Sequence, residues 1–165
     1  MMSKLLTLLT VAVFAIGCSS TKTSGQAAPG TLDFGDYTSQ TLTTNAWNAY
    51  NAGDYMAVLK YTEKCIELYE EQAVEMQAAL KNEPARRGQK SAEEIHANWA
   101  LNDVGTSYFI RGETLFKLGR KEEALAAYKA VMNQFNYAQT WDPKGWFWSP
   151  AEAANPKVTQ LSGDF

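Results

Sequence analysis

Hydrophobic and polar residues follow a helical period along most of the chain. Between residues 38 and 135 apolar positions recur every three or four residues, and no alternating strand pattern persists. The pattern predicts four helices, over residues 39–53, 54–82, 91–118 and 120–135. Residues 82–90 contain Pro84 and Gly88, which predict a loop. The predicted fold class is therefore all-α, with two long central helices.

Capping and breaking residues set the predicted helix boundaries. Ser39 and Asp54 are typical N-cap residues, because their side-chain oxygens can accept from the free amides of a first helical turn. Ser91 and Glu94 have the spacing of a capping box. Gly119 ends the third predicted helix and separates it from the fourth.

Two glycines lie inside the third predicted helix. Gly105 and Gly112 share the helix face of Leu101, Tyr108 and Leu115. A glycine in a helix interior costs about 1 kcal/mol relative to alanine. Close approach of a neighbouring helix would compensate for that cost, so we expect helix–helix contacts at both positions.

Residues 108–131 have the spacing of a known helical repeat. The matching residues are Tyr108, Gly112, Leu115, Phe116, Gly119, Ala124, Tyr128 and Val131. This segment resembles a tetratricopeptide repeat (TPR), in which small residues sit where two antiparallel helices touch. A degenerate copy runs from residue 46 to residue 65, with Val58 and Thr62 at two motif positions. Because Gly53 and Gly119 are 66 residues apart rather than about 34, the resemblance implies TPR-like hairpins with extended inner helices, not a regular array.

The resemblance implies a partner-binding face along the first helix of each hairpin. On this chain that face comprises Thr43, Trp47, Tyr50, Asn51, Thr106, Phe109, Glu113, Phe116 and Lys117. Such a mixture of aromatic and polar side chains suits an extended peptide or a partner helix. The alternative is that the extended helices or the C-terminal segment cover these positions.

Residues 137–165 form a Trp-rich C-terminal segment after a helical domain at residues 38–136. Trp141, Trp146 and Trp148 flank an Asp-Pro-Lys-Gly turn, and the last two would share one side of an extended strand. Ser149 is predicted to begin a short helix that ends at Pro156. The segment either caps the open end of the helical stack or presents the three tryptophans as a platform for a glycan, a peptide or a protein.

The start of the chain has the parts of an export signal. Lys4 precedes the apolar residues 5–17, a stretch too short for a bilayer core of about 30 Å. The segment Ala15-Ile16-Gly17-Cys18 resembles the lipobox of bacterial lipoproteins, which implies cleavage of residues 1–17 and acylation of Cys18. Residues 18–37 would then be a lipidated, flexible tether. Ser19 resembles the residue of lipoproteins sorted to the outer membrane, so the expected location is its inner leaflet, facing the periplasm.

Composition and the absence of motifs argue against several function classes. The net charge is −3 with interspersed charges, which gives no indication of nucleic-acid binding. Cys65 lies among apolar residues and is expected to be buried rather than reactive. His96 is the only histidine, expected at the surface or in helix packing, and no metal, nucleophile or phosphate motif accompanies it. We therefore expect a non-enzyme without a cofactor or metal.

The leading hypothesis is an envelope-anchored lipoprotein that mediates protein–protein interaction in a membrane or periplasmic complex. The sequence names no particular partner. The alternative is a cell-wall or glycan-binding lipoprotein that uses Trp141, Trp146 and Trp148. A hydrolase is a third possibility that no motif favours.

Overall fold

Six helices and one β-hairpin make up the described part of the chain, residues 32–82 and 91–163 of a computed structural model. The elements are α1 (Ser39–Ala52), α2 (Tyr55–Asn82), α3 (Ala92–His96), α4 (Trp99–Lys117), α5 (Lys121–Gln134), β1 (Thr140–Asp142), β2 (Trp146–Trp148) and α6 (Pro150–Ser162). A mostly helical fold is thus confirmed. The predicted signal peptide, Cys18, most of the tether and most of the 82–90 loop lie outside the described residues.

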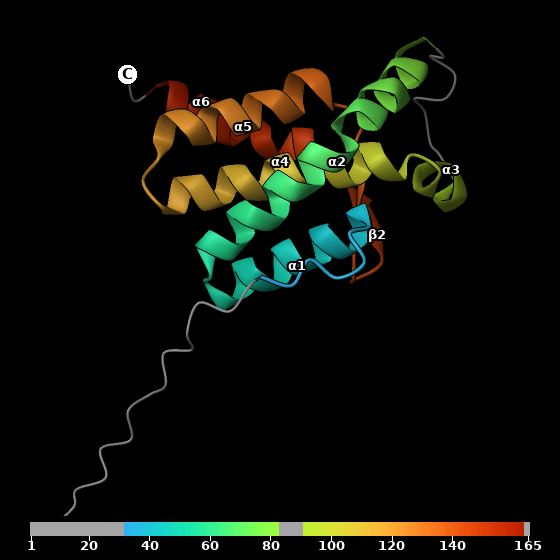
Figure 1. Ribbon diagram of the computed structural model, residues 1–165. Helices are drawn as coiled ribbons and strands as arrows, with labels where there is room; N and C mark the ends of the chain where they lie inside the picture. Colours follow the sequence, from blue (N-terminus) through green and yellow to red (C-terminus); the bar gives the residue numbers. More distant parts are fainter. Residues whose placement is uncertain (1–31, 83–90, 164–165) are drawn as a thin grey trace, which may run out of the picture. The chain divides into compact units, whose positions relative to one another are not determined.

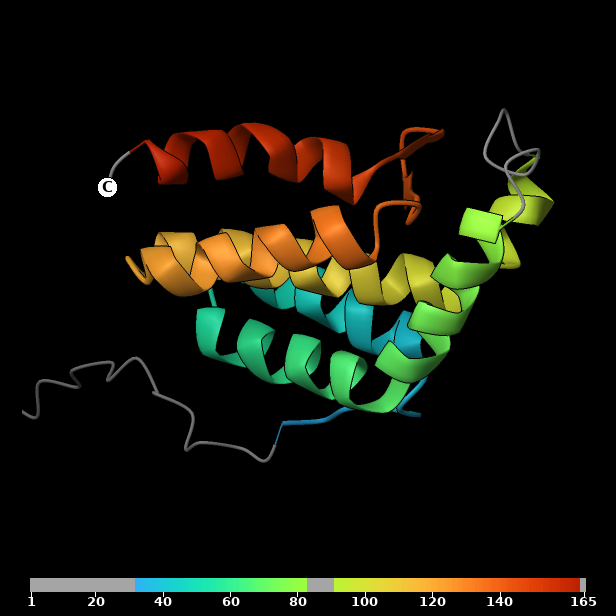
Figure 2. The ribbon, with the colours of Figure 1, turned by 90° about the horizontal axis from the view of Figure 1, so that it is seen from above.

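The helices pack antiparallel around α4, which contacts α1, α2, α5 and α6. Figures 1 and 2 show α1 and α2 on one side of α4, and α5 followed by α6 on the other. The core between them includes Leu42, Leu101, Leu115, Tyr128 and Phe135, all almost fully buried. The long second helix is confirmed, because α2 runs for 28 residues.

The turns after α1 and α4 have the same geometry. Gly53 has φ +75° and Gly119 has φ +74°, values that glycine adopts without the strain of a Cβ. In both turns the amide of the next residue donates to the carbonyl five positions earlier, at 2.9 Å. Both glycines therefore end helices where the sequence predicts an end.

The interior glycines of α4 mark two close approaches. A Cβ at Gly105 would lie 2.5 Å from the Cβ of Ala138, and one at Gly112 would lie 2.6 Å from the Tyr128 ring. These distances are far below ordinary van der Waals contact. The expected helix–helix contact is confirmed at Gly112, where the neighbour is α5, whereas at Gly105 the close neighbour is Ala138 in the loop after α5 and not a helix.

The single helix predicted over residues 91–118 is wrong, because the structure has α3 and α4 with a break at residues 97–98. The capping box of Ser91 and Glu94 is present and begins α3. At the break, the Asn98 side-chain amide donates to the Glu94 carbonyl at 2.9 Å, and the Asn102 side-chain amide donates to the Ile95 carbonyl at 2.8 Å. Asparagine side chains thus take carbonyls that a continuous helix would pair with its own amides.

The first turn of α1 begins at a different cap from the predicted Ser39. Thr38 is the N-cap, and its hydroxyl accepts from the Thr41 amide at 3.2 Å. Ser39 is instead the first residue of the helix and is buried. Its side chain is therefore free for a contact with another helix.

The last helix is longer than predicted. Ser149 caps α6 as expected, accepting from the Glu152 amide at 3.2 Å. The predicted end at Pro156 is wrong, since α6 continues through this proline to Ser162. Leu161, in the last turn, is 1% exposed, and its burial stabilises a turn that a proline alone would disfavour.

Residues 32–37, the end of the predicted tether, lie against α2. The Tyr61 hydroxyl donates to the Asp33 carbonyl at 2.9 Å, and the Tyr69 hydroxyl donates to the Tyr37 carbonyl at 2.8 Å. The Phe34 ring packs edge-on against Tyr61. Among the described residues, no helix combines the length and apolar character needed to cross a bilayer.

Candidate binding pocket

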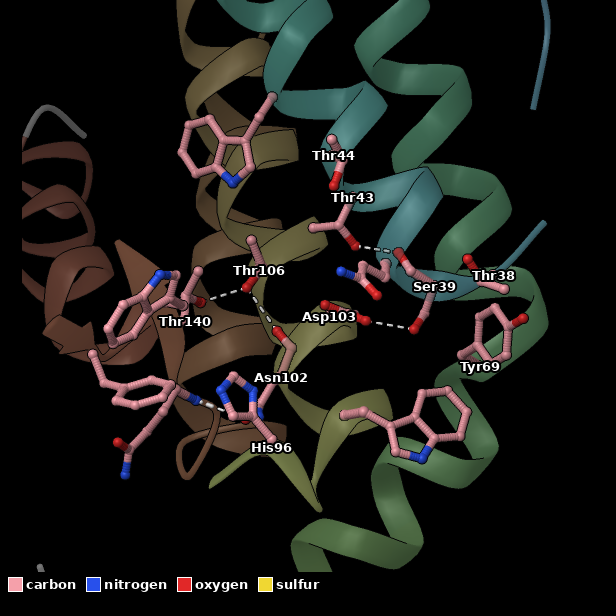
Figure 3. A pocket seen from close by; sticks show the side chains of 16 residues that line it. Thr38, Ser39, Thr43, Thr44, Tyr69, His96, Asn102, Asp103, Thr106 and Thr140 are labelled. Carbon is pink, nitrogen blue, oxygen red and sulfur yellow. Dashed lines mark hydrogen bonds between the residues drawn. The ribbon is translucent and has the colours of Figure 1, made fainter. Parts of the chain in front are cut away.

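A pocket of about 710 Å³ lies between α1, α4 and the β-hairpin. Helix α3 and one residue of α2 complete its wall, as the side chains in Figure 3 show. We call it the α1–α4 pocket; its lining residues are Thr38, Ser39, Gln40, Thr43, Thr44, Trp47, Tyr69, His96, Trp99, Asn102, Asp103, Thr106, Gln139, Thr140, Trp141 and Phe147. The lining is therefore largely aromatic rings, hydroxyls and amides.

Aromatic side chains hold one another in position around the pocket. Tyr69 of α2 and Trp99 of α4 pack edge to face with ring centroids 5.5 Å apart. The Phe147 ring lies 5.0 Å from Trp141 and 5.3 Å from His96. Trp99 and Trp141 nevertheless remain 40% and 50% exposed. These rings offer a preorganised apolar surface to a ligand.

Asp103 of α4 places a carboxylate in this aromatic surrounding. Figure 3 shows it in the middle of the pocket, between Tyr69 on one side and Thr140 on the other. Burial raises the pKa of Asp103 to about 6, although a hydrogen bond from the Ser39 hydroxyl acts in the opposite direction. No lysine or arginine is among the described residues that line the pocket.

A hydrogen-bonded frame fixes the elements around Asp103. The Asn102 side chain donates to the Ile95 carbonyl at 2.8 Å and accepts from the Gln139 amide at 2.9 Å. Thr106 donates to the Asn102 carbonyl at 2.7 Å, and its hydroxyl also bonds that of Thr140. Helix α4 thereby ties both α3 and the hairpin to the walls of the pocket.

Part of the predicted partner-binding face lies in this pocket. Thr43, Trp47 and Thr106 line it, and the Thr43 hydroxyl donates to the Ser39 carbonyl at 2.5 Å. Phe109 does not line the pocket but packs on the hairpin, with its ring 5.3 Å from that of Trp148. The face predicted from α1 and α4 is thus continuous with the hairpin.

Helix α6 covers another part of the predicted face. Glu113 accepts from the Tyr128 hydroxyl at 2.6 Å and pairs with Lys157 of α6 at 2.8 Å. The Lys157 ammonium also lies 5.7 Å from the Phe116 ring centroid. The remaining predicted residues of this face, none of which lines the pocket, are the half-buried Tyr50 and the exposed Asn51 and Lys117.

The three tryptophans of the predicted platform do not share one face. Antiparallel pairing sets Trp141 opposite Phe147 and Thr140 opposite Trp148. Because side chains alternate along a strand, Trp141 points to the face opposite that of Trp146 and Trp148. Trp141 lines the pocket, whereas Trp148 packs on Phe109 and Trp146 stays 49% exposed.

Several residues of the pocket were not identified from the sequence. Ser39 was interpreted as a cap, and neither Asp103 nor Trp99 was singled out. A signal for Asp103 was present, since it is the only charged residue between His96 and Arg111. His96 is exposed and packs on Phe147, in keeping with the surface or packing position expected for it.

Cys65 is buried, as expected. Burial raises the pKa of its thiol to about 11, which keeps the thiol protonated and poorly nucleophilic at neutral pH. Within residues 32–82 and 91–163, no group of three His, Cys, Asp or Glu side chains is placed to hold a metal ion.

Comparison with protein-family models, curated proteins and solved structures gave no match for this chain. The geometry of the α1–α4 pocket is therefore the basis on which a function can be inferred.

Proposed function

We propose that this chain is an envelope-anchored lipoprotein whose α1–α4 pocket binds a segment of a protein partner. The observation that carries the proposal is the pocket itself, about 710 Å³ in volume and walled by mutually packed aromatic rings. Rigid aromatic side chains supply large contact areas at low entropic cost, and they dominate many protein interfaces. The hydroxyls and amides between the rings would bond to the backbone of an extended segment.

The helical hairpins α1–α2 and α4–α5 support a TPR-type architecture as part of this proposal. Their turns share a left-handed glycine and the same pair of hydrogen bonds. The Tyr128 ring packs on Gly112, the kind of large-on-small contact that the repeat uses between its two helices. In such repeats the first helices form the binding face, which here corresponds to α1 and α4.

The anchor is the second part of the proposal, and it rests on the lipobox resemblance at residues 15–18. Cys18 would carry the acyl chains and hold the pocket close to the outer membrane, facing the periplasm. Metabolic labelling with palmitate tests this directly. We expect label in the wild type and none in Cys18→Ala; equal labelling of the two proteins would contradict lipidation at Cys18.

Contacts in the pocket favour binding over catalysis. Asp103 is engaged by the Ser39 hydroxyl, and His96 packs against the Phe147 ring. Both groups are thus held by contacts within the protein itself. We propose that the pocket holds its ligand unchanged.

Site-specific photocrosslinking in intact cells tests the binding face. A benzophenone amino acid that replaces Thr44 would lie in the pocket, because Thr44 lines it from an exposed position of α1. The matched control is Glu63, an exposed residue of α2 that does not line the pocket. We expect a discrete adduct from position 44 and none from position 63. Identical patterns from both positions, or no adduct from a folded, membrane-bound protein labelled at 44, would contradict the proposal.

A glycan ligand is the second candidate, favoured by the exposed rings of Trp99 and Trp141 beside hydroxyl and amide groups. Sedimentation with isolated peptidoglycan distinguishes it from a protein ligand. Binding that is lost in Trp141→Ala and kept in Trp146→Ala would favour the glycan. Sedimentation of none of the three proteins would favour the protein partner.

A further inference from the structure

We propose that the α1–α4 pocket recognises the guanidinium group of an arginine side chain in the partner, and that Asp103 is the residue that binds it. This inference rests on the proposed function, because it names the chemistry of the segment that the pocket takes. Three features of the pocket lead to it: an uncompensated carboxylate, its unused acceptor positions and the flat rings that line the same pocket.

The charge of Asp103 has no cationic partner among the described residues of the pocket. It lies within walls made of α1, α2, α3, α4 and the hairpin, and none of their described lining residues is a lysine or arginine. A partly buried carboxylate without a counter-charge is costly. A cationic ligand group would supply that missing counter-charge.

The carboxylate also has acceptor positions to spare. An ionised carboxylate offers about four lone-pair sites, and the hydrogen bond from Ser39 reaches Oδ2. The structure gives Asp103 no second hydrogen-bond donor among the described residues. Oδ1 is therefore available to the N–H groups of a ligand.

The flat aromatic walls favour a guanidinium over an ammonium. Trp99 and Trp141 are exposed, and each is held by a neighbouring ring. A guanidinium is planar and weakly hydrated, so it can stack on such rings while it donates to a carboxylate. An ammonium is a compact and strongly hydrated charge that uses such walls less well.

The other titratable groups around Asp103 define the pH at which this recognition operates. Cys65 and Tyr69 face it from α2, His96 from α3, and α1 contributes only hydroxyls and amides together with the Trp47 ring. Protonation of Asp103 removes the attraction for a cation. Affinity for an arginine ligand is therefore expected to fall as the pH falls below about 6.

Tryptophan fluorescence of the full-length lipoprotein in detergent micelles tests the inference. The probes are the peptide Ac-Gly-Arg-Gly-NH₂ and the same peptide with citrulline, an uncharged isostere of arginine. At pH 7.5 we expect the arginine peptide to bind roughly tenfold more tightly, the difference that a charge-assisted hydrogen bond commonly makes. In Asp103→Asn the two peptides should bind equally, whereas the control Glu63→Gln should keep the difference.

Equal binding of the two peptides by the wild type would overturn the inference, as would a preference that survives in Asp103→Asn. Tighter binding of the corresponding lysine peptide would overturn the assignment to a guanidinium. Binding of soluble peptidoglycan fragments without binding of either peptide would overturn the inference and favour a glycan as the ligand of the pocket. A crosslinked partner at position 44 together with no arginine preference would remove this inference alone and leave the proposed function standing.

Discussion

The hydroxyl of Ser39 donates a hydrogen bond to the carboxylate of Asp103, joining two helices across a separation of 64 residues. Ser39 is the first residue of α1, and Asp103 lies in the first half of α4. The bond fixes the orientation of a carboxylate that no described lysine or arginine of the pocket neutralises. The fold thus keeps a charge in a place where it costs stability, as binding sites often do.

The cost in stability of placing the Asp103 carboxylate there leads to a prediction about pH. The pKa of Asp103 is raised from 3.8 to about 6 in the folded protein, so the folded state binds more protons than the unfolded state between these values. The contribution of Asp103 to the free energy of unfolding is therefore most favourable below pH 4 and is lost as the pH rises through 6. At pH 7.5 Asp103→Asn should be more stable than the wild type by on the order of 2 kcal/mol.

Urea denaturation of both proteins at pH 4 and pH 7.5 measures this effect. The two proteins differ only at the carboxylate of Asp103, so the change of their difference with pH reports the ionisation of that group. The difference in unfolding free energy should be small at pH 4 and grow towards pH 7.5. A difference that does not change with pH would contradict a partly buried carboxylate with a raised pKa at Asp103.

The contact between Gly112 and Tyr128 predicts a sharp response to one added methyl group. The Tyr128 ring is fully buried and its hydroxyl donates to Glu113, so it cannot swing away from a new Cβ at 2.6 Å. We expect Gly112→Ala to lower the free energy of unfolding by about 2 kcal/mol, despite the better helix propensity of alanine.

The control for this substitution is Gly163→Ala, at the end of α6. A Cβ there would have its closest neighbour at 3.6 Å, and its φ is −84°. Urea denaturation should show a change within about 0.5 kcal/mol. Equal effects of the two substitutions would show that α4 and α5 do not approach as closely as described.

Asn102 is predicted to hold the pocket walls together. Asn102→Ala removes the bonds to the Ile95 carbonyl and the Gln139 amide, and we expect a loss of about 1 kcal/mol, because the part-buried Gln139 amide loses its acceptor while the Ile95 carbonyl keeps the Asn98 amide. Hydrogen exchange should accelerate for the Gln139 amide and for α3. Asn98→Ala removes one exposed bond, to Glu94, and should leave the exchange of Gln139 unchanged; acceleration in both variants would argue against a specific role of Asn102.

Much of the helical fold could be predicted because its signals are local. Gly53 and Gly119 end helices through their own conformational freedom, and Ser91 with Glu94 begins one through two bonds three residues apart. A close neighbour at Gly105 and Gly112 was also predictable, since glycine in a helix interior needs compensation, but the neighbour is a helix only at Gly112. The break before α4 depends instead on an Asn102 side chain that reaches back seven residues.

The pocket could be predicted only in pieces. Thr43, Trp47, Thr106 and Trp141 were identified as candidate contact residues, but Trp141 was assigned to a separate aromatic platform. These side chains line one pocket because of the hairpin register and the contacts of α4 with the hairpin, and no local sequence pattern predicts either. Asp103 was missed for the same reason, because its partner lies in another helix.

The most direct test of the account compares Trp141→Ala with Trp146→Ala in the crosslinking experiment at position 44. The two tryptophans are on the same hairpin and are 50% and 49% exposed, but only Trp141 lines the α1–α4 pocket. We predict that Trp141→Ala reduces the yield of the adduct at least several-fold while Trp146→Ala leaves it at the wild-type level. Equal yields from the two variants, with both proteins folded and anchored, would contradict the claim that this pocket binds the partner.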